Sequence, residues 1–536
     1  MPHSYRKSIL SLLLALVILL SAASAAFAAA EPGGVDPSPI VYVIGRTTIY
    51  DDPNSPDRKI LAKASKSEIT AAVKEALPYA AKAALLGQWD AYADKTYGLL
   101  MQFFDGYGLD ENGEVANSSG PSFSWSEDNL SRDYKSSNPY TYRFEYDARL
   151  SPLEIADELN EFVEAVKRVT EKEKVSFISR CLGVNIMMSY LYKYQEPLGY
   201  AGVDSIVMYD SSFRGIEILE AGMSGNVTIE PASALAFLKN FDLDLGDETL
   251  DAVLELTLQM LEETYGLEVL TKFFEGFYSH IKYSLIRRFF MSTFATTPGY
   301  WSMVYDGYDD AKAYLFSDKG DDVKYQKLIE KLDAYRNNVQ LRGETMLQNM
   351  KEAGVDIGVV CKYGFRSYPV FDGSSKLSDG ITGLAKQSFG ATVSDYDGTL
   401  TESYLAARTE AGYGQYLSPD KQIDASTCLF PDATWFIKNY EHDPFHDCIN
   451  PLLLSICRNN NFTVGDDENW PQFLYLVNSG TVVPMTEENA DPNSQITHEG
   501  EATRKVAPFS FFRFLKYLFN VVKLLVQSKI AEKQAA

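Results

Sequence analysis

Short hydrophobic runs alternate along the chain with longer segments of helical periodicity. The runs that we predict to be strands are rich in Val, Ile, Tyr and Phe and cover residues 39–44, 142–147, 174–178, 203–209, 356–363 and 434–438. The helical patterns between the early runs cover residues 66–103, 152–170 and 182–195. Strands that alternate with helices of these lengths are typical of a mostly parallel sheet with helices on both faces. The pattern therefore predicts an α/β fold.

The helix over 152–170 has a specific start signal. Ser151 is followed by Pro152 and, two residues later, by Glu154. Serine is a preferred N-cap, proline fits the first helical position, and glutamate at the third position completes a capping box. We predict that this helix begins at Pro152 and that the side chain of Ser151 caps it.

One long stretch between two predicted strands, from about Ala221 to Lys351, contains helical patterns alone, for example at 247–265 and 323–338. A helical insertion between two strands of a sheet is usually a cap over the active site, and an ordinary helical domain is the alternative. We therefore divide the chain into a leader, a first core part, a helical cap, a second core part and a C-terminal helix, at residues 1–30, 31–220, 221–351, 352–500 and 501–536.

The first thirty residues have the pattern of a secretory signal peptide. Arg6 and Lys7 precede an apolar run over residues 9–20, and small residues dominate positions 21–30. The apolar run is too short, and its flanks are wrong, for a membrane-spanning helix. The sequence predicts an exported protein, extracellular or associated with the cell envelope. An uncleaved membrane anchor is the alternative.

The C-terminal segment predicts an amphipathic helix. Between Phe509 and Ile530, basic and polar residues recur at three- and four-residue spacings among aromatic and aliphatic side chains. A basic stripe beside an apolar face is typical of a helix that lies on a membrane surface. We expect peripheral membrane contact through this segment, and packing of the helix on the protein's own core is the alternative.

Charge and cysteine content restrict the partners of the chain. Its formal net charge is −24, and phosphate backbones attract an excess of Lys and Arg, so we predict no nucleic-acid partner. The five cysteines are an odd number without a C-x-x-C pair, so at least one thiol stays outside any intrachain disulfide and no zinc framework is visible. Disulfide pairing stays open among Cys361, Cys428, Cys448 and Cys457.

The fifth cysteine lies where a predicted strand meets a predicted helix, in the sequence Ser179-Arg180-Cys181-Leu182-Gly183. A nucleophile elbow presents its reactive residue on a strained strand-to-helix turn, with small residues two positions before and after it. Ser179 and Gly183 are the small residues that this geometry needs. The sequence therefore predicts that Cys181 is a nucleophile. A structural cysteine in an ordinary turn is the alternative.

An elbow also predicts where an oxyanion would be bound. The backbone N–H of Leu182, at the start of the helix, would be one donor. The second donor would come from the loop after the first strand, near Gly45, Arg46 or Thr47. Arg180 could favour a thiolate or an anionic substrate, but we expect it to be solvated or paired at the surface.

With these residues the chain resembles the exported bacterial lipases among the α/β-hydrolases. The blocks that carry the resemblance are 39–45, Tyr146-Asp147-Ala148-Arg149, 174–183, 297–301, 378–381 and 434–442. They are spread over most of the chain after the leader. The resemblance implies an α/β-hydrolase-type sheet with an inserted helical lid, and it implies neither a cofactor nor a metal ion.

The chain departs from those lipases at the elbow itself, which usually reads Gly-His-Ser-x-Gly-Gly. Here Arg180 stands in place of histidine and Cys181 in place of serine, with Ser179 and Val184 at two of the glycine positions. The first strand, which usually ends in His-Gly, has Ile44 in place of the histidine. Cysteine elbows occur in dienelactone hydrolases and polyhydroxyalkanoate synthases, so a thiol is compatible with covalent catalysis.

The resemblance also implies the partners of Cys181. It places the acid at Asp379, in a Ser-Asp-Gly-Ile turn, with Asp210, just after the strand 203–209, as the alternative acid. His442 follows the strand 434–438 at the position of the hydrolase histidine, and the order Cys181, Asp379, His442 is that of nucleophile, acid and histidine. A metal pair of His442 and His446 has no third ligand in view.

These residues predict an exported lipase-like or esterase-like acyl hydrolase with a Cys-His-Asp triad and an ester, possibly lipidic, as substrate. A thiol beside a histidine can ionise near neutral pH, and the histidine can then protonate the leaving alkoxide. One alternative is a catalytically inactive α/β-hydrolase-fold protein that binds a hydrophobic ligand or a protein partner. A remote alternative is an acyltransferase resembling polyhydroxyalkanoate synthase.

Overall fold

The computed structural model describes residues 38–44, 48–122, 125–133, 140–229, 275–443, 447–477 and 480–490. Four predictions fall outside these residues: the signal peptide, the helix over 247–265, the C-terminal amphipathic helix and the loop 45–47 with Arg46.

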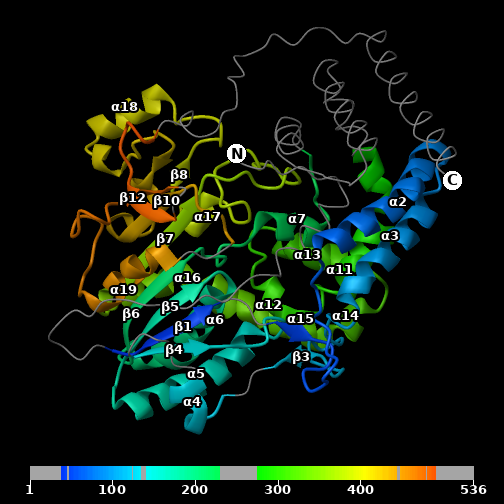
Figure 1. Ribbon diagram of the computed structural model, residues 1–536, viewed down its shortest axis with the longest axis horizontal. Coiled ribbons are helices and arrows are strands. Elements are labelled where there is room, and N and C mark those ends of the chain that lie inside the picture. Colours follow the sequence, from blue (N-terminus) through cyan, green and yellow to red (C-terminus); the bar gives the residue numbers. More distant parts are fainter. Residues whose placement is uncertain are drawn as a thin grey trace, which may run out of the picture.

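Eight strands form one sheet (Figure 1). From edge to edge, their order is β12 (Thr481–Pro484), β11 (Phe473–Val477), β10 (Thr434–Lys438), β7 (Asp356–Tyr363), β6 (Val203–Tyr209), β5 (Val175–Arg180), β1 (Ile40–Ile44) and β4 (Thr141–Phe144). All neighbouring strands run parallel except β11 and β12. The predicted mostly parallel sheet is confirmed, and β6, β7 and β10 have the bounds of their hydrophobic runs.

Helices cover both faces of this sheet. On β5, Phe177 packs in the core on the side of α6 (Leu182–Tyr190) and α5 (Pro152–Thr170). The next residue, Ile178, packs in a second core on the side of α19 (Asn450–Arg458). Successive side chains of a strand point to opposite faces, so a strand buried on both sides is apolar at consecutive positions. This explains why the runs of the inner strands lack the alternation of a half-exposed strand, whereas β4, at the edge of the sheet, has exposed Arg143 between buried neighbours.

Further helices are α2 (Lys66–Leu86), α3 (Trp89–Phe104), α4 (Glu127–Asp133), α7 (Glu217–Ser224), α11 (Arg288–Ser292), α12 (Pro298–Trp301), α13 (Tyr308–Leu315), α14 (Asp321–Lys324), α15 (Gln326–Tyr335), α16 (Gly343–Glu352), α17 (Leu384–Gln387) and α18 (Glu402–Glu410). Short strand pairs join β2 (Ile49–Tyr50) to β3 (Gly120–Pro121) and β8 (Thr392–Val393) to β9 (Ile423–Asp424). Single π-helical turns follow α6 and α15 at Leu191–Gln195 and Arg336–Gln340.

The prediction of one helix over 66–103 is wrong, because the chain turns between α2 and α3. Gly87 ends α2 in a left-handed conformation with φ 69°, and its N–H donates to the carbonyl oxygen of Ala83. Glycine adopts this conformation without steric cost and is the usual residue after a helix end. The two helices pack side by side instead (Figure 1).

The predicted start of α5 is confirmed at Pro152, but the predicted capping by the Ser151 side chain is wrong. The hydroxyl of Ser151 makes no capping hydrogen bond. Instead the backbone carbonyl oxygen of Ser151 accepts hydrogen bonds from the N–H groups of Glu154 and Ile155, each at 2.9 Å. The first turn of α5 is therefore closed by the backbone, without a hydrogen bond to the serine side chain.

Between β6 and β7, the described residues 275–352 contain helices and turns, as predicted for the cap segment. This block packs closely on the sheet layer: the side-chain amide of Asn185 in α6 donates to the carbonyl oxygen of Ser302 at 2.7 Å. A Cβ on Gly299 would lie 2.0 Å from the carbonyl oxygen of Ala148. The predicted helix over 323–338 is interrupted at Tyr325, between α14 and α15. A lid role for the block stays a prediction.

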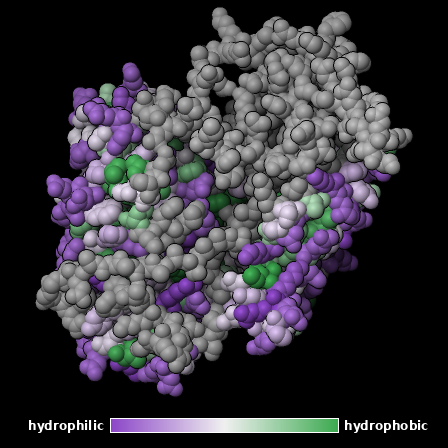
Figure 2. All heavy atoms as spheres, viewed as in Figure 1, coloured by the Kyte–Doolittle hydropathy of each residue, from purple (hydrophilic) through white to green (hydrophobic). Residues whose placement is uncertain are grey.

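Where Figure 2 shows described residues, the surface is mostly hydrophilic with small, separate hydrophobic areas. The large hydrophobic side chains that are exposed lie far apart in the sequence and include Leu86, Leu198, Tyr283 and Val323. Within the described part of the chain, no helix has the length and the hydrophobicity needed to cross a membrane.

Candidate active site

Cys181 occupies the turn between β5 and α6, as the elbow interpretation requires. Its backbone has φ 50° and ψ −125°, a strained conformation that is uncommon for residues other than glycine. A Cβ on Gly183 would lie 1.9 Å from the carbonyl oxygen of Val43, so a glycine is needed where the start of α6 crosses β1. Ser179 is fully buried two residues before the cysteine. These features are those of a nucleophile elbow.

The structure brings Cys181, Asp379 and His442 together at the carboxyl ends of the strands. Nδ1 of His442 lies 2.7 Å from Oδ2 of Asp379. The backbone N–H of His442 also donates to the carbonyl oxygen of Asp379 at 2.9 Å. The imidazole also interacts with the Cys181 thiol, and this interaction changes the pKa of both groups. The three side chains therefore lie in the order thiol, imidazole, carboxylate, as the groups of a catalytic triad do.

Asp379 is held by the turn that contains it. Its Oδ1 accepts the backbone N–H groups of Ile381 at 2.9 Å and Thr382 at 2.8 Å, which leaves Oδ2 for His442. Burial acts to raise the pKa of Asp379, but His442 and the amide of Thr382 lower it below its ordinary value. An anionic, oriented carboxylate fixes the proton of the imidazole on Nδ1 and leaves Nε2 for the thiol.

The charges around Cys181 favour a thiolate and an imidazolium. Burial acts to raise the pKa of Cys181, but the charge and hydrogen bond of His442, together with the charge of Arg180, lower it. Burial acts to lower the pKa of His442, but Asp379 and Cys181 raise it to about 10. Each shift stabilises the charged form of its group, and the two groups titrate as a pair.

One of the two predicted oxyanion donors can be located. The backbone N–H of Leu182 lies at the start of α6 and contributes to the lowered pKa of Cys181. A helix start directs N–H groups and a positive dipole end towards bound negative charge. The same amide is therefore placed to stabilise negative charge beside the sulfur. Arg46 lies outside the described residues.

The expectation that Arg180 is solvated or paired at the surface is wrong. Its side chain is 11% exposed and forms ion pairs with Asp210 at 3.1 Å and Asp443 at 2.9 Å. Asp210 is fully buried and pairs at 2.8 Å with the equally buried Lys362. Asp210 is thus engaged by two cations, while the ring nitrogen of His442 is bonded to Asp379. The structure favours Asp379 over Asp210 as the acid of the triad.

Sequence reasoning missed Lys362. The signal that could have found it is a charged residue at the seventh position of the buried run Asp356–Tyr363. Charged residues are almost never fully buried unless they are paired, so a lysine inside a buried strand predicts a buried anion beside it. Tyr146 is also fully buried and lies within electrostatic reach of Cys181.

Asp210, Asp379 and His442 are close enough together to be considered as metal ligands. Two observations oppose a cation there. Lys362 and Arg180 already neutralise Asp210, and Nδ1 of His442 is used by Asp379. The donor set therefore does not fit a metal ion, which would have to displace both cations. His446 lies outside the described residues, so a His442–His446 pair is not tested.

The remaining cysteines and histidines contrast with the triad. Cys361, Cys428 and Cys457 are buried free thiols. Burial raises the pKa of all three, to about 12 for Cys428 and Cys457. His280 stacks on Trp89 at 4.5 Å between ring centroids, in contact with the α2–α3 side of the molecule. Of Cys181, Cys361, Cys428 and Cys457, Cys181 alone has a lowered pKa; the fifth described cysteine, Cys448, is a partly exposed free thiol.

One hollow of about 530 Å³ lies beside the loop that carries Asp379. It is lined by residues of α7 and of the chain around α17, among them Glu217 and Lys386. The backbone N–H of Gly383 donates to Glu217 at 3.1 Å, which joins α7 to the acid-bearing loop. Cys181 is not among its lining residues.

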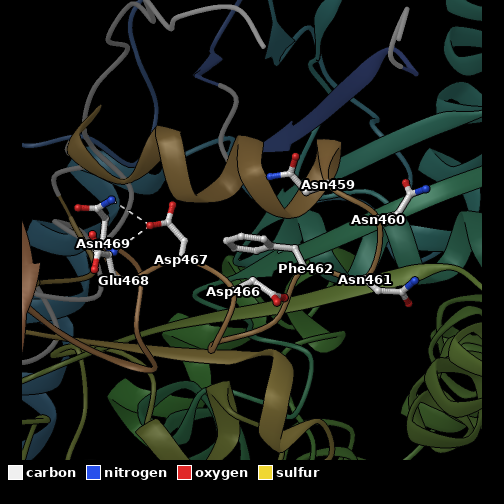
Figure 3. A pocket seen from close by; sticks show the side chains of 8 residues that line it. All are labelled: Asn459, Asn460, Asn461, Phe462, Asp466, Asp467, Glu468 and Asn469. Carbon is white, nitrogen blue, oxygen red and sulfur yellow. Dashed lines mark hydrogen bonds between the residues drawn. The ribbon is translucent and has the colours of Figure 1, made fainter. Parts of the chain in front are cut away.

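A second hollow, of about 560 Å³, is lined by amide and carboxylate side chains between Asn459 and Asn469 (Figure 3). The N–H of Asn461 donates to the side chain of Asp356 at the amino end of β7. Cys181, Asp379 and His442 lie at the carboxyl ends of the strands, whereas this hollow lies at their amino ends. The hollow is therefore not part of the site around Cys181.

No protein-family model matches the chain, and no curated protein matches its sequence. The resemblance to exported lipases therefore stays a prediction that rests on the motifs and on the triad geometry.

Proposed function

We propose that the chain is a cysteine-dependent acyl hydrolase of the α/β-hydrolase type that cleaves an ester through a thioester intermediate. The observation that supports it most is the His442–Asp379 hydrogen bond beside Cys181, whose pKa His442 lowers, with Cys181 on a strained turn between β5 and α6. The mostly parallel sheet is compatible with this fold type. Export, a lipidic ester and a helical lid belong to the same proposal and are supported by the sequence patterns.

The proposed reaction has two steps. The thiolate of Cys181 attacks the ester carbonyl carbon, and a C–S bond forms while the carbonyl oxygen becomes an oxyanion near the N–H of Leu182. The C–O bond to the alcohol then breaks, and the imidazolium of His442 gives its proton to the departing alkoxide. In the second step, neutral His442 takes a proton from water, the hydroxide attacks the thioester, and the carboxylic acid and the thiolate are released.

Alkylation of Cys181 tests the first requirement of this mechanism. We expect iodoacetamide to modify Cys181 faster than the other cysteines, with an apparent pKa below the free-thiol value of about 8.5. The sign follows from the lowered thiol pKa: more thiolate is present at neutral pH, so the reaction is faster there. Substitution His442→Ala should abolish the depression. The buried Cys457, whose pKa is raised, is the internal control.

Hydrolysis of p-nitrophenyl esters of short and long acids tests the second requirement. Cys181→Ala should remove activity, whereas Cys457→Ala should keep it, because Cys457 belongs to α19 and packs in the second core, on the other face of the sheet. Cys181→Ser could retain some activity, because an elbow commonly presents a hydroxyl. Unchanged turnover by Cys181→Ala would refute the mechanism. A normal, His442-independent thiol without ester cleavage would favour the ligand-binding alternative.

A further inference from the structure

Two cations from neighbouring parts of the sheet hold the loop that carries His442. Lys362 of β7 donates to the carbonyl oxygens of Glu441 at 2.8 Å and His442 at 2.9 Å. Arg180, at the end of β5, donates to the same His442 carbonyl oxygen and, at 2.9 Å, to Oδ1 of Asp443. Three consecutive residues are therefore anchored by two side chains that come from rigid strands.

Asp210 balances these cations from the end of β6. Its Oδ2 lies 2.8 Å from Nζ of Lys362 and 3.1 Å from Nε of Arg180. Asp210 and Lys362 are 0% exposed, and a buried cation without a partner would cost several kcal/mol. The carboxylate therefore makes it feasible to keep two cations beneath the histidine loop. Its Oδ1 accepts no hydrogen bond from the described residues.

The charges around the Cys181–His442 pair also favour its ionised form. Arg180 and Lys362 carry two positive charges, and Asp210, Asp379 and Asp443 carry three negative charges. Moving a proton from Cys181 to His442 creates one charge of each sign and leaves this sum unchanged. The two cations lower the electrostatic cost of holding a thiolate–imidazolium pair beside these carboxylates.

We propose that Arg180, Asp210 and Lys362 form a positioning cluster for the Cys181–His442 pair. Lys362 and Arg180 hold the backbone of His442 so that its ring reaches the thiol, Asp210 keeps both cations in place, and the guanidinium of Arg180 stabilises the thiolate. The inference rests on the proposed function in one respect: it takes Cys181 as the reactive group. It adds an electrostatic reason why this elbow carries a thiol beside an arginine.

Several groups around the pair affect its titration. Cys181 faces His442, Arg180, the amide of Leu182 and Tyr146, whose pKa burial raises well above its ordinary value. His442 faces Asp379 as well. The carboxyl groups of Asp210 and Glu441 lie behind it, and burial raises the pKa of both, opposed by Lys362. Glu441→Gln removes the carboxyl group nearest the surface. It measures how much this group contributes to the pH dependence of Cys181 alkylation.

The test measures alkylation of Cys181 by iodoacetamide between about pH 5 and pH 9.5 in the full chain, with each variant checked by thermal melting. An opposite charge nearby shifts a pKa by about one unit or more, so Arg180→Met should raise the apparent thiol pKa by about one unit. Lys362→Met should also raise it, because the His442 loop is released. Arg408→Met is the matched control: Arg408 pairs at 2.7 Å with buried Asp424, away from the triad.

Arg180→Lys distinguishes the effect of the positive charge of Arg180 from the effect of its hydrogen bonds to the His442 loop. Lysine keeps the positive charge but lacks the planar fork that reaches Asp210, Asp443 and the His442 carbonyl together. We expect this variant to keep most of the low thiol pKa and to lose several-fold in kcat for ester hydrolysis, with a smaller change in KM. It also decides the matter if Arg180→Met does not fold.

The outcomes distinguish this inference from the proposed function. A thiol pKa in Arg180→Met and Lys362→Met equal to that of Arg408→Met overturns the positioning cluster, even if esters are cleaved through Cys181. An unchanged pKa together with unchanged kcat in Arg180→Lys overturns it as well. A low, Arg180-dependent thiol pKa in a protein that cleaves no ester supports the cluster and refutes the hydrolase.

Discussion

Two turns of the molecule, at Arg149 and at Arg180, each contain an arginine with little or no exposed surface and a close backbone contact made by a glycine. The two arginines bind different kinds of partner. After β4, Arg149 is 0% exposed and binds Asp147 through two nitrogens, with further hydrogen bonds to Ser119 and to the carbonyl oxygen of Tyr107. After β5, Arg180 binds Asp210, Asp443 and the carbonyl oxygen of His442. The first set of partners joins two loops of the scaffold.

The second turn differs because it ends at a group that can change its charge. Cys181 follows Arg180 directly and is partly exposed, with a lowered pKa, and His442 beside it has a raised pKa. A buried ion pair therefore does not by itself indicate a functional site. A site is indicated where such a pair supports a nucleophilic group whose pKa it alters.

The largest expected effect comes from replacing Asp379, which bonds to His442, and it is compared with replacing Asp147, which pairs with Arg149. Asp379→Asn should lower kcat for ester hydrolysis by on the order of 10³ to 10⁴, because an amide no longer fixes the imidazole tautomer or stabilises its charge. The pKa of His442 should fall, since Asp379 is the main group that raises it. Steady-state kinetics and NMR titration of His442 measure the two effects. Asp147→Asn should change neither kcat nor that pKa, and an equal loss in both variants would contradict the distinction.

The second effect concerns stability. Arg149→Met should lower the free energy of unfolding by about 3–5 kcal/mol, because it leaves the buried carboxylate of Asp147 without its cation. Urea denaturation followed by fluorescence measures it. The apparent pKa of the Cys181 thiol should stay at its parental value in the folded variant. A raised thiol pKa would mean that the Arg149 turn also supports the active site.

The sequence was sufficient to predict the mostly parallel sheet and the three residues that the structure brings together, Cys181, Asp379 and His442. β6, β7 and β10 could be bounded because strands buried on both faces are continuous apolar runs. Cys181 could be found because an elbow has a local pattern, with small residues at fixed positions around the nucleophile. The turn at Gly87 was missed because a helical pattern continues on both sides of it.

The positioning cluster could not be predicted, because its contacts join residues that are distant in the sequence. Arg180 lies 30 positions from Asp210 and 262 from His442, and Lys362 lies 80 from His442. No local pattern links such positions, since the register of three strands brings them together. The same distance explains why Arg180 was expected to be at the surface.

The third effect compares the two glycines. Gly183→Ala and Gly299→Ala each place a Cβ about 2 Å from a backbone carbonyl oxygen, of Val43 and Ala148 respectively. Overpacking of this kind costs about 1–3 kcal/mol, so both variants should unfold at lower urea concentration. Gly183→Ala should in addition slow alkylation of Cys181, because the start of α6 must move. If Gly299→Ala slows alkylation equally, the two turns are not independent.

The smallest effect comes from Gly98→Ala, which is the control for adding a methyl group to the backbone. Gly98 lies inside α3 at an exposed position, and a Cβ there would meet no atom within 4 Å. Gly98→Ala should therefore raise the free energy of unfolding by about 0.5–1 kcal/mol, because alanine restricts the unfolded chain and favours the helix. It should leave the thiol pKa and kcat at their parental values. A loss of stability in Gly98→Ala would show that any added methyl group is harmful in this protein, and the glycine comparison at Cys181 and Arg149 would then lose its meaning.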